Sequence, residues 1–183
     1  LVMRRVFEGI FSSNRYENRE EMLEKEITSY AKAKSIVYLE FGVWEGNSII
    51  HLANKLDNPN HKFYGFDSFQ GLPESWDTLS GVKEAGHFST KGNKPQIDDC
   101  RVEFIQGWFQ NSIDPFITQL KLDKPFITQL KLDKLSLVVH FDADLYSSTL
   151  FCLMQVDRFK SEYLAFFDEI PGHETRALYN YVQ

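Results

Sequence analysis

The sequence SIVYLEFGVWEGNSIIHLANKL, at residues 35–56, reads as a strand, a turn and a helix in succession. Residues 35–41 are a short β-rich apolar run, the turn contains Gly42 and Gly46, and the apolar side chains of residues 47–56 recur at helical spacing. The same alternation continues along the chain, with further strands predicted at 62–66, 102–105, 135–141 and 163–167 and further helices at 18–33 and 149–159. This pattern predicts an α/β fold of the Rossmann-like class, in which helices cover both faces of a mostly parallel sheet.

The composition predicts a single domain that binds a small molecule. With 183 residues, 43% of them hydrophobic, the chain is long enough for one α/β core and too short for two ordinary domains. A net charge of −6 argues against a nucleic-acid partner, because phosphate contacts need a basic face. Cys100 and Cys152 lie far apart with no CxxC pairing, which is typical of a reducing compartment. Since no apolar run reaches about 18 residues and no signal peptide is visible, we expect a cytoplasmic protein with no membrane partner.

Two segments flank or interrupt the alternation of strands and helices. Residues 1–34 are expected to form an N-terminal helical segment of the domain that spans residues 1–183. Residues 70–99 contain four glycines and two prolines among charged residues, without sustained periodicity. Loops of this length are usually functional or disordered, so we expect residues 70–99 to form a long mobile loop over the site.

A perfect tandem repeat precedes the most apolar strand. The segment PFITQLKLDK at residues 115–124 recurs unchanged at 125–134, a period too short for any common solenoid. Asp114 and Pro115 predict an N-cap and a first helical residue, and Pro125 should interrupt a helix that runs through both copies. One copy is therefore expected to form a helix, and the other a separate turn or short helix on the surface.

The turns that follow the first three strands carry candidate binding residues. Gly42 and Gly46 keep side chains out of the space where backbone approaches a ligand, although an ordinary tight turn has the same pattern. Asp67 ends the second strand, where a carboxylate can accept hydrogen bonds from ribose hydroxyls or simply cap the loop. The segment Gln106-Gly107-Trp108 follows the third strand, where an amide and an indole can bind a purine or pack in the core.

Carboxylates follow the last two predicted strands. Asp142 ends the most apolar strand, and Asp168 and Glu169 end the next one, so the three can gather at one edge of a parallel sheet. Carboxylates that share a site need a cation, and oxygen ligands favour Mg²⁺, Mn²⁺ or Ca²⁺. His140 and His173 are candidate bases near the acids. The alternatives are helix caps for the acids, a buried structural role for His140 and a loop position for His173.

Four ordered motifs carry a resemblance to a known family. They are Glu40-x-Gly42-Val43-Trp44-x-Gly46-x-Ser48, Gly65-Phe66-Asp67-Ser68-Phe69-x-Gly71-Leu72-Pro73-Glu74, Gly107-Trp108-Phe109 and Asp142-x-Asp144-Leu145-Tyr146-x-Ser148-Thr149. With these motifs the chain resembles the macrocin O-methyltransferase (TylF-like) family between residues 36 and 177. The resemblance implies a class I S-adenosylmethionine-dependent methyltransferase fold, and transfer of a methyl group to a sugar hydroxyl with the help of Mg²⁺.

The resemblance also implies roles for individual residues. The metal would be held by Asp142, Asp168 and Glu169. The catalytic residues would be Asp142 and, as candidate bases, His140 and His173. The cofactor S-adenosylmethionine would be bound by Glu40, Gly42, Trp44, Gly46, Ser48, Asp67, Ser68, Gln106, Gly107, Trp108 and Asp142. The family fold ends in a β-hairpin that we expect this chain to lack, which would expose a strand edge and favour a homodimer.

Three functions compete at this stage. The first is an active O-methyltransferase that acts on a sugar or another small polyol. The second is a degenerate module that binds S-adenosylmethionine without turnover. The third, a Rossmann enzyme that binds NAD or a nucleotide sugar, is disfavoured because the chain lacks a GxGxxG turn and carries paired acids after two strands.

Overall fold

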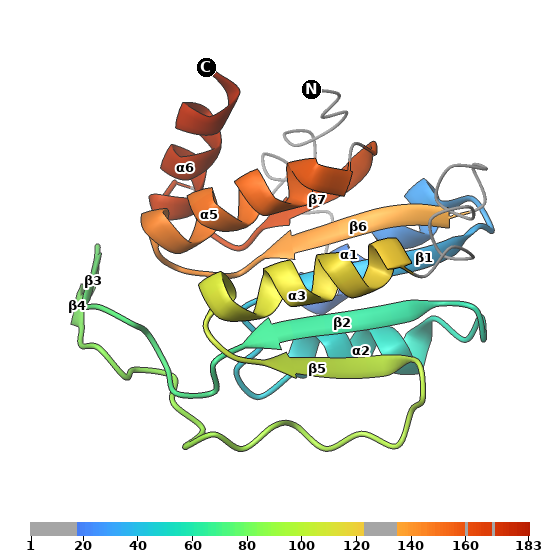
Figure 1. The fold of residues 1–183 in the computed structure, drawn as a ribbon, viewed down its shortest axis with the longest axis horizontal. Helices are drawn as coiled ribbons and strands as arrows, with labels where there is room; N and C mark the ends of the chain where they lie inside the picture. The colour runs from blue at the N-terminus through green and yellow to red at the C-terminus, as the bar shows by residue number, and fades with distance from the viewer. Residues whose placement is uncertain (1–17, 123–134, 160, 170) are drawn as a thin grey trace.

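The structure, a computed structural model, describes residues 18–122, 135–159, 161–169 and 171–183. Five parallel strands form one sheet in the order β5-β2-β1-β6-β7 (Figure 1). Their bounds are β1 Ser35–Phe41, β2 Lys62–Asp67, β5 Val102–Gln106, β6 Leu135–Phe141 and β7 Tyr163–Phe167. The five predicted strands are thus confirmed to within a residue, as is the α/β architecture with a mostly parallel sheet.

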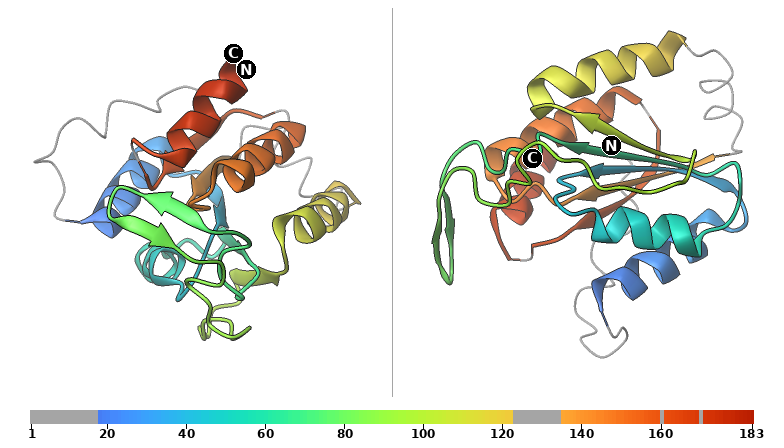
Figure 2. Two further views of the ribbon diagram at one scale, coloured as in Figure 1. Left: turned by 90° about the vertical axis from the view of Figure 1, so that its left-hand side faces the viewer. Right: turned by 90° about the horizontal axis from the view of Figure 1, so that it is seen from below.

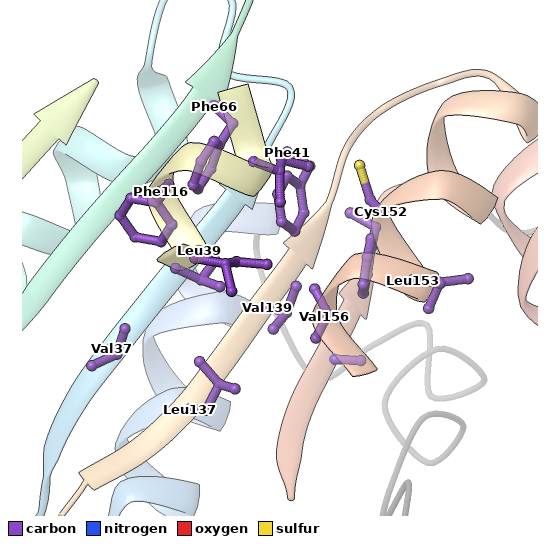
Figure 3. Close-up of a cluster of buried hydrophobic side chains, with 14 of the residues drawn as sticks. Val37, Leu39, Phe41, Phe66, Phe116, Leu137, Val139, Cys152, Leu153 and Val156 are labelled. Carbon is purple, nitrogen blue, oxygen red and sulfur yellow. The ribbon is translucent and has the colours of Figure 1, made fainter. Parts of the chain in front are cut away.

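Helices cover both faces of this sheet, which gives three layers (Figure 2). On one face α1 (Arg19–Ala31) and α2 (Asn47–Lys55) bury Leu23, Ile27, Ile49 and Leu52 against the strands. The other face carries α3 (Phe109–Leu122), α5 (Tyr146–Val156) and α6 (His173–Val182), and a short 3-10 helix, η1 (Asp157–Phe159), follows α5. Figure 3 shows the core on that second face, where side chains of β1 and β6 meet those of α3 and α5.

The central strands explain why the sequence pattern was so clear. In both β1 and β6 every residue after the first is buried, so their side chains are covered from above and below. A strand buried on both faces reads as a continuous apolar run rather than an alternating one. Helix α1 begins where Asn18 caps it, because the Asn18 side chain accepts a hydrogen bond of 2.8 Å from the Glu21 N–H.

The predicted start of the helix in the repeat region is wrong. Helix α3 begins at Phe109, so Asp114 is not its N-cap and Pro115 lies inside it. The Trp108 carbonyl accepts hydrogen bonds from the Asn111 and Ser112 N–H groups, which starts the helix before the repeat. Pro115 has no N–H to donate to the Asn111 carbonyl, and both residues lie at exposed positions of the helix, where water can bind that carbonyl. The first copy therefore continues a helix, while Pro125 and the second copy lie outside the described residues.

The loop at residues 70–99 contains more structure than its sequence predicts. Strands β3 (Trp76–Thr78) and β4 (Gly81–Lys83) pair antiparallel in a hairpin that projects from the body of the molecule (Figure 1). The hydroxyl of Thr78 donates to the Gly81 carbonyl at 2.7 Å and closes the turn. At its base the loop is tied back by a hydrogen bond of 2.8 Å from the Gly92 N–H to the Phe69 carbonyl.

Two helices differ from the predicted pattern near the end of the chain. Helix α5 begins at Tyr146, three residues before its predicted start, and α6 was not predicted at all. Helix α6 packs on α5 through Ala177 and Leu178, on the same face of the sheet as α3. Among the helices of the described residues, none combines the length and the apolar character that a bilayer crossing requires.

Candidate active site

A pocket of about 310 Å³ opens at the carboxyl ends of the strands. Strand β1 has β2 on one side and β6 on the other, so the chain changes direction across the sheet at this point. In open parallel sheets, ligands bind where such a reversal leaves a crevice between the strand ends. The lining includes eleven of the residues predicted from the sequence, namely Glu40, Gly42, Trp44, Ser48, Asp67, Ser68, Gly107, Trp108, Asp142, Asp168 and Glu169.

Gly42 lines the pocket at a position where a residue with a side chain does not fit. Its φ is +96°, and a Cβ atom at this position would lie 1.7 Å from the Asp142 carbonyl oxygen. Its N–H donates to the Phe66 carbonyl at 3.0 Å. The turn after β1 is thereby held against β2 and β6 at once, which brings the predicted cofactor turn next to the predicted metal ligand.

Asp67 binds the backbone of the same turn. Its Oδ2 accepts hydrogen bonds of 2.8 Å from the N–H groups of Val43 and Trp44, and its Oδ1 accepts one of 2.7 Å from Phe69. The loop-capping role considered for this aspartate is therefore present in the structure. Each carboxylate oxygen can accept two hydrogen bonds, so Oδ1 retains capacity for a ligand hydroxyl.

Four of the predicted residues that the structure describes lie outside the pocket lining: Gly46, Gln106, His140 and His173. Gly46 caps α2 with a φ of +80°, and the Gln106 amide donates to the Gly92 carbonyl of the long loop at 3.3 Å. His173 is the first residue of α6. These residues support the walls of the site without facing it.

His140 is a buried member of a polar network. Its Nδ1 lies 3.0 Å from the Tyr38 hydroxyl and 3.1 Å from Glu40 Oε1, and its Nε2 lies 3.8 Å from Asp168 Oδ1. Burial lowers the pKa of His140, but the Asp168 and Glu40 carboxylates outweigh that effect and raise the pKa to about 10. The imidazole is therefore protonated at neutral pH and is a partner of the acids rather than a base.

Glu40 lines the pocket and carries a buried carboxylate oxygen without a partner among the described residues. The side chain is 2% exposed, and Oε1 is taken by His140. Within the described residues Oε2 is buried with no hydrogen-bond partner. A buried acceptor without a partner is costly, so this atom favours a ligand that brings a cation or an N–H group.

The acids at the ends of β6 and β7 share one cation from the protein itself. Arg19 Nη1 lies 3.1 Å from Asp142 Oδ2 and 2.7 Å from Asp168 Oδ1. Burial raises the pKa of Asp142, and the opposing effects of His140 and Arg19 do not cancel this rise. For Asp168, His140 and Arg19 outweigh burial and lower the pKa. Burial lowers the pKa of Arg19, but Asp168 and Asp142 raise it above its usual value. The guanidinium therefore remains charged between the two carboxylates.

Part of the predicted metal set is assembled. Ligand atoms of His140, Asp142 and Asp168 all lie within 4.8 Å of one another, whereas Glu169 lines the pocket outside this group. A protonated imidazole cannot ligate a metal, so the two aspartates are the fitting donors. Hard carboxylate oxygens match Mg²⁺, which keeps several waters when a protein supplies only one or two carboxylates.

Three charged residues at the site were not predicted from the sequence. Arg19 reaches the acids from positions 123 and 149 residues away in the chain, which no local pattern could indicate. Asp144 lines the pocket, and burial, with Asp142 and Glu169 nearby, raises its pKa to about 8. Its place in the Asp142-x-Asp144 motif was a signal that could have identified it.

Glu174 is the third missed residue. Its carboxylate is fully buried and accepts four backbone hydrogen bonds at 2.8–3.2 Å, from Ala143, Asp144, Asp168 and Glu169. These donors follow β6 and β7, so one side chain of α6 ties together the two loops that carry the acids. An acid in the first turn of a predicted helix would have been the signal, but α6 itself was not predicted.

Apolar side chains line the part of the pocket beneath the long loop. Leu72, Trp76 and Leu145 form a small buried cluster with Phe88 packed against it. Trp44 and Trp108 are exposed large aromatic residues of the lining, at 43% and 37% exposure. The pocket therefore combines an acidic end with flat apolar surfaces suited to a ring.

Fold and site together define the chain as an α/β protein with an acidic pocket at the switch point of its sheet. No protein-family model matches the chain, and no curated protein matches it. The resemblance to macrocin O-methyltransferases therefore remains a prediction from the motifs.

Proposed function

We propose that the chain is an S-adenosylmethionine-dependent O-methyltransferase that acts on a hydroxyl of a sugar or another small polyol, assisted by Mg²⁺. One observation carries the proposal: the same pocket is lined by Glu40, which has a buried carboxylate oxygen without a partner among the described residues, and by Asp142 and Asp168. The Glu40 carboxylate suits a cationic cofactor, and the Asp142 and Asp168 carboxylates suit a metal ion that would bind the acceptor hydroxyl. The class I methyltransferase fold belongs to this proposal, because the architecture alone is common to many α/β proteins.

The turn after β1 supports the cofactor half of the proposal. S-adenosylmethionine would supply an electrophilic methyl group and a methionine ammonium group. Glu40 Oε2 would accept from the ammonium group, and Gly42 leaves the backbone free of side chains beside it. Trp108 would cover the adenine ring, and Asp67 Oδ1 has capacity for a ribose hydroxyl.

The ends of β6 and β7 support the acceptor half. Asp142 and Asp168 would hold Mg²⁺, with Glu169 at the edge of the same pocket, and the ion would lower the pKa of an acceptor hydroxyl. Asp144 is the candidate base because it lines the pocket, whereas His140 and His173 do not. Its pKa of about 8 makes the ionised carboxylate a stronger proton acceptor than an ordinary aspartate, so turnover should rise as the pH is raised through about 8. Asp144 would take the hydroxyl proton as the oxygen forms its bond to the methyl carbon and the sulfur–methyl bond breaks.

A methyl-transfer assay tests this function. Purified protein, radiolabelled S-adenosylmethionine and a panel of sugars and polyols should yield a methylated product in the presence of Mg²⁺. Replacing the base in Asp144→Asn should lower turnover by about 10²- to 10⁴-fold and leave S-adenosylhomocysteine affinity unchanged. Asp77→Asn, on the exposed hairpin, is the matched control and should keep full activity.

The assay also separates the alternative. Protein that binds S-adenosylhomocysteine but methylates no acceptor in the panel would favour the module that binds without turnover. Full turnover in Asp144→Asn would remove this residue from the mechanism. Tight binding of NAD in place of S-adenosylhomocysteine would instead support the third function.

A further inference from the structure

Arg19 occupies the point between the two carboxylates that fit a metal. A single nitrogen, Nη1, makes both contacts, at 3.1 Å to Asp142 Oδ2 and 2.7 Å to Asp168 Oδ1. An Mg²⁺ ion bound by the same two oxygens would lie about 2.1 Å from each. The guanidinium and the ion therefore cannot be present together, because both need the same space.

The surroundings allow Arg19 to leave this position while α1 stays in place. Arg19 is the first residue of α1, and the helix is held by Leu23 and Ile27, which are fully buried in the core. The Arg19 side chain is 36% exposed and has a second acid within reach, since its Nε lies 3.6 Å from Glu20 Oε1. A change of side-chain rotamer thus suffices to release the aspartates.

We propose that Arg19 is a built-in competitor of the divalent cation, which neutralises Asp142 and Asp168 when no metal is bound and is displaced when the metal enters. This inference rests on the metal site of the proposed function. Two adjacent, partly exposed carboxylates without a cation repel each other, so the arginine keeps the pair assembled. Arg19 also raises the concentration of metal ion that is needed for binding, because the ion must replace two charge-assisted contacts.

Binding of Mn²⁺, followed by the loss of the free-ion electron paramagnetic resonance signal, tests the competition directly. Arg19→Gln should bind Mn²⁺ at least about 10-fold more tightly than the wild-type protein. Arg176→Gln removes the same charge from a guanidinium that packs on the Tyr146 ring, and its affinity should stay within about 2-fold of wild type. Asp142→Asn should lose Mn²⁺ binding.

Salt distinguishes displacement from long-range repulsion. At about 0.5 M KCl the Debye length falls to about 4 Å, so an effect of charge at a distance disappears while competition for the same oxygens persists. In the wild-type protein, added Mg²⁺ should also shift the Arg19 Nε–H resonance, which is assigned by its absence from Arg19→Gln, because the guanidinium leaves Asp142 and Asp168.

The inference is overturned if Arg19→Gln and Arg176→Gln change Mn²⁺ affinity equally, if the advantage of Arg19→Gln disappears in salt, or if Mg²⁺ binds without moving the Arg19 signal. Failure of Arg19→Gln to bind any Mn²⁺ would overturn both this inference and the metal site. S-adenosylhomocysteine binding would still report separately on the cofactor half of the proposed function.

Discussion

At the residue scale, the site depends on the close packing around Gly42 and on the hydrogen bonding of Glu40. Gly42 lies so close to the Asp142 carbonyl that a side chain there would collide with backbone. Glu40 lines the pocket, with one oxygen bound to His140 and the other buried without a partner among the described residues. Both residues were named from the sequence: Gly42 from its place in a tight turn after a strand, and Glu40 from the motif that carries the family resemblance.

Substitution of Gly42 tests the close approach of the turn and β6. Gly42→Ala combines a positive φ with a collision against the Asp142 carbonyl and should lower the free energy of unfolding by at least about 3 kcal/mol. Gly86→Ala is the matched control, since Gly86 has a φ of +83° but no atom within 4 Å of an added Cβ. It should cost about 1 kcal/mol. Equal losses in urea denaturation would mean that the close approach does not exist.

At the element scale, α6 organises the acidic end of the pocket. The Glu174 carboxylate accepts the N–H groups that follow β6 and β7, so the direction in which Asp142 and Asp168 point depends on a helix outside the sheet. Sequence reasoning predicted that the acids would meet, because parallel strand ends share one edge. It could not predict the tie between them, since α6 is short and buries only Ala177 and Leu178 of its apolar residues, and it was not predicted.

Removal of this carboxylate should loosen both loops. Glu174→Ala leaves four backbone N–H groups without their acceptor and should lower the free energy of unfolding by about 3 kcal/mol. It should also weaken Mn²⁺ binding at Asp142. Glu162→Ala, an exposed acid just before β7, should change neither quantity. A Glu174→Ala protein with wild-type stability and Mn²⁺ affinity would show that α6 does not position the acids.

A histidine directly before β2 should make the stability of the sheet depend on pH. His61 is buried, and its Nδ1 accepts a hydrogen bond of 3.1 Å from the Ile36 N–H. Burial, and then Arg101, lower the pKa of His61 below its usual 6.5. The unfolded chain therefore takes up this proton first, so the stability that His61 contributes is present above about pH 7 and is lost as the pH falls through about 6.5 and below.

Two histidine variants isolate the contribution of His61 to the free energy of unfolding. The wild-type protein should be more stable than His61→Gln at about pH 8, and the difference should shrink toward about pH 5. His87→Gln, in the exposed part of the long loop, should differ from wild type by the same small amount at both pH values. If the gap between wild type and His61→Gln is independent of pH, the imidazole is not held neutral by the Ile36 N–H.

The strands were easier to predict than the helix ends and loops. A strand such as β6, buried on both faces, requires an apolar residue at nearly every position, and this requirement is visible in the sequence alone. The start of α3 depends instead on the Trp108 carbonyl and not on Asp114 or Pro115, so the local capping signal was misleading. The hairpin of β3 and β4 is too short and exposed for an apolar pattern.

At the scale of the whole molecule, the pocket exists because segments far apart in the chain meet at one sheet edge. Glu40 lies near the end of β1 and Gly42 directly after it, and Asp67 is the last residue of β2. The other acids directly follow β6 and β7. The observed strand order β5-β2-β1-β6-β7 brings these turns together. The sequence predicted a mostly parallel sheet whose strand ends converge, but not the order of its strands. Arg19 could not be predicted, because its contact with the acids is made only after α1 packs across the assembled sheet.

Calorimetric titration with S-adenosylhomocysteine tests the central claim, that this pocket binds the methyl donor. We predict micromolar affinity for the wild-type protein, with Mg²⁺ present or absent, and binding at least about 10-fold weaker in Glu40→Gln, which removes the charge of the unpaired oxygen. Glu45→Gln, exposed in the same turn, should bind as the wild type does. No heat of binding to folded wild-type protein, or equal affinity in Glu40→Gln, would contradict the account.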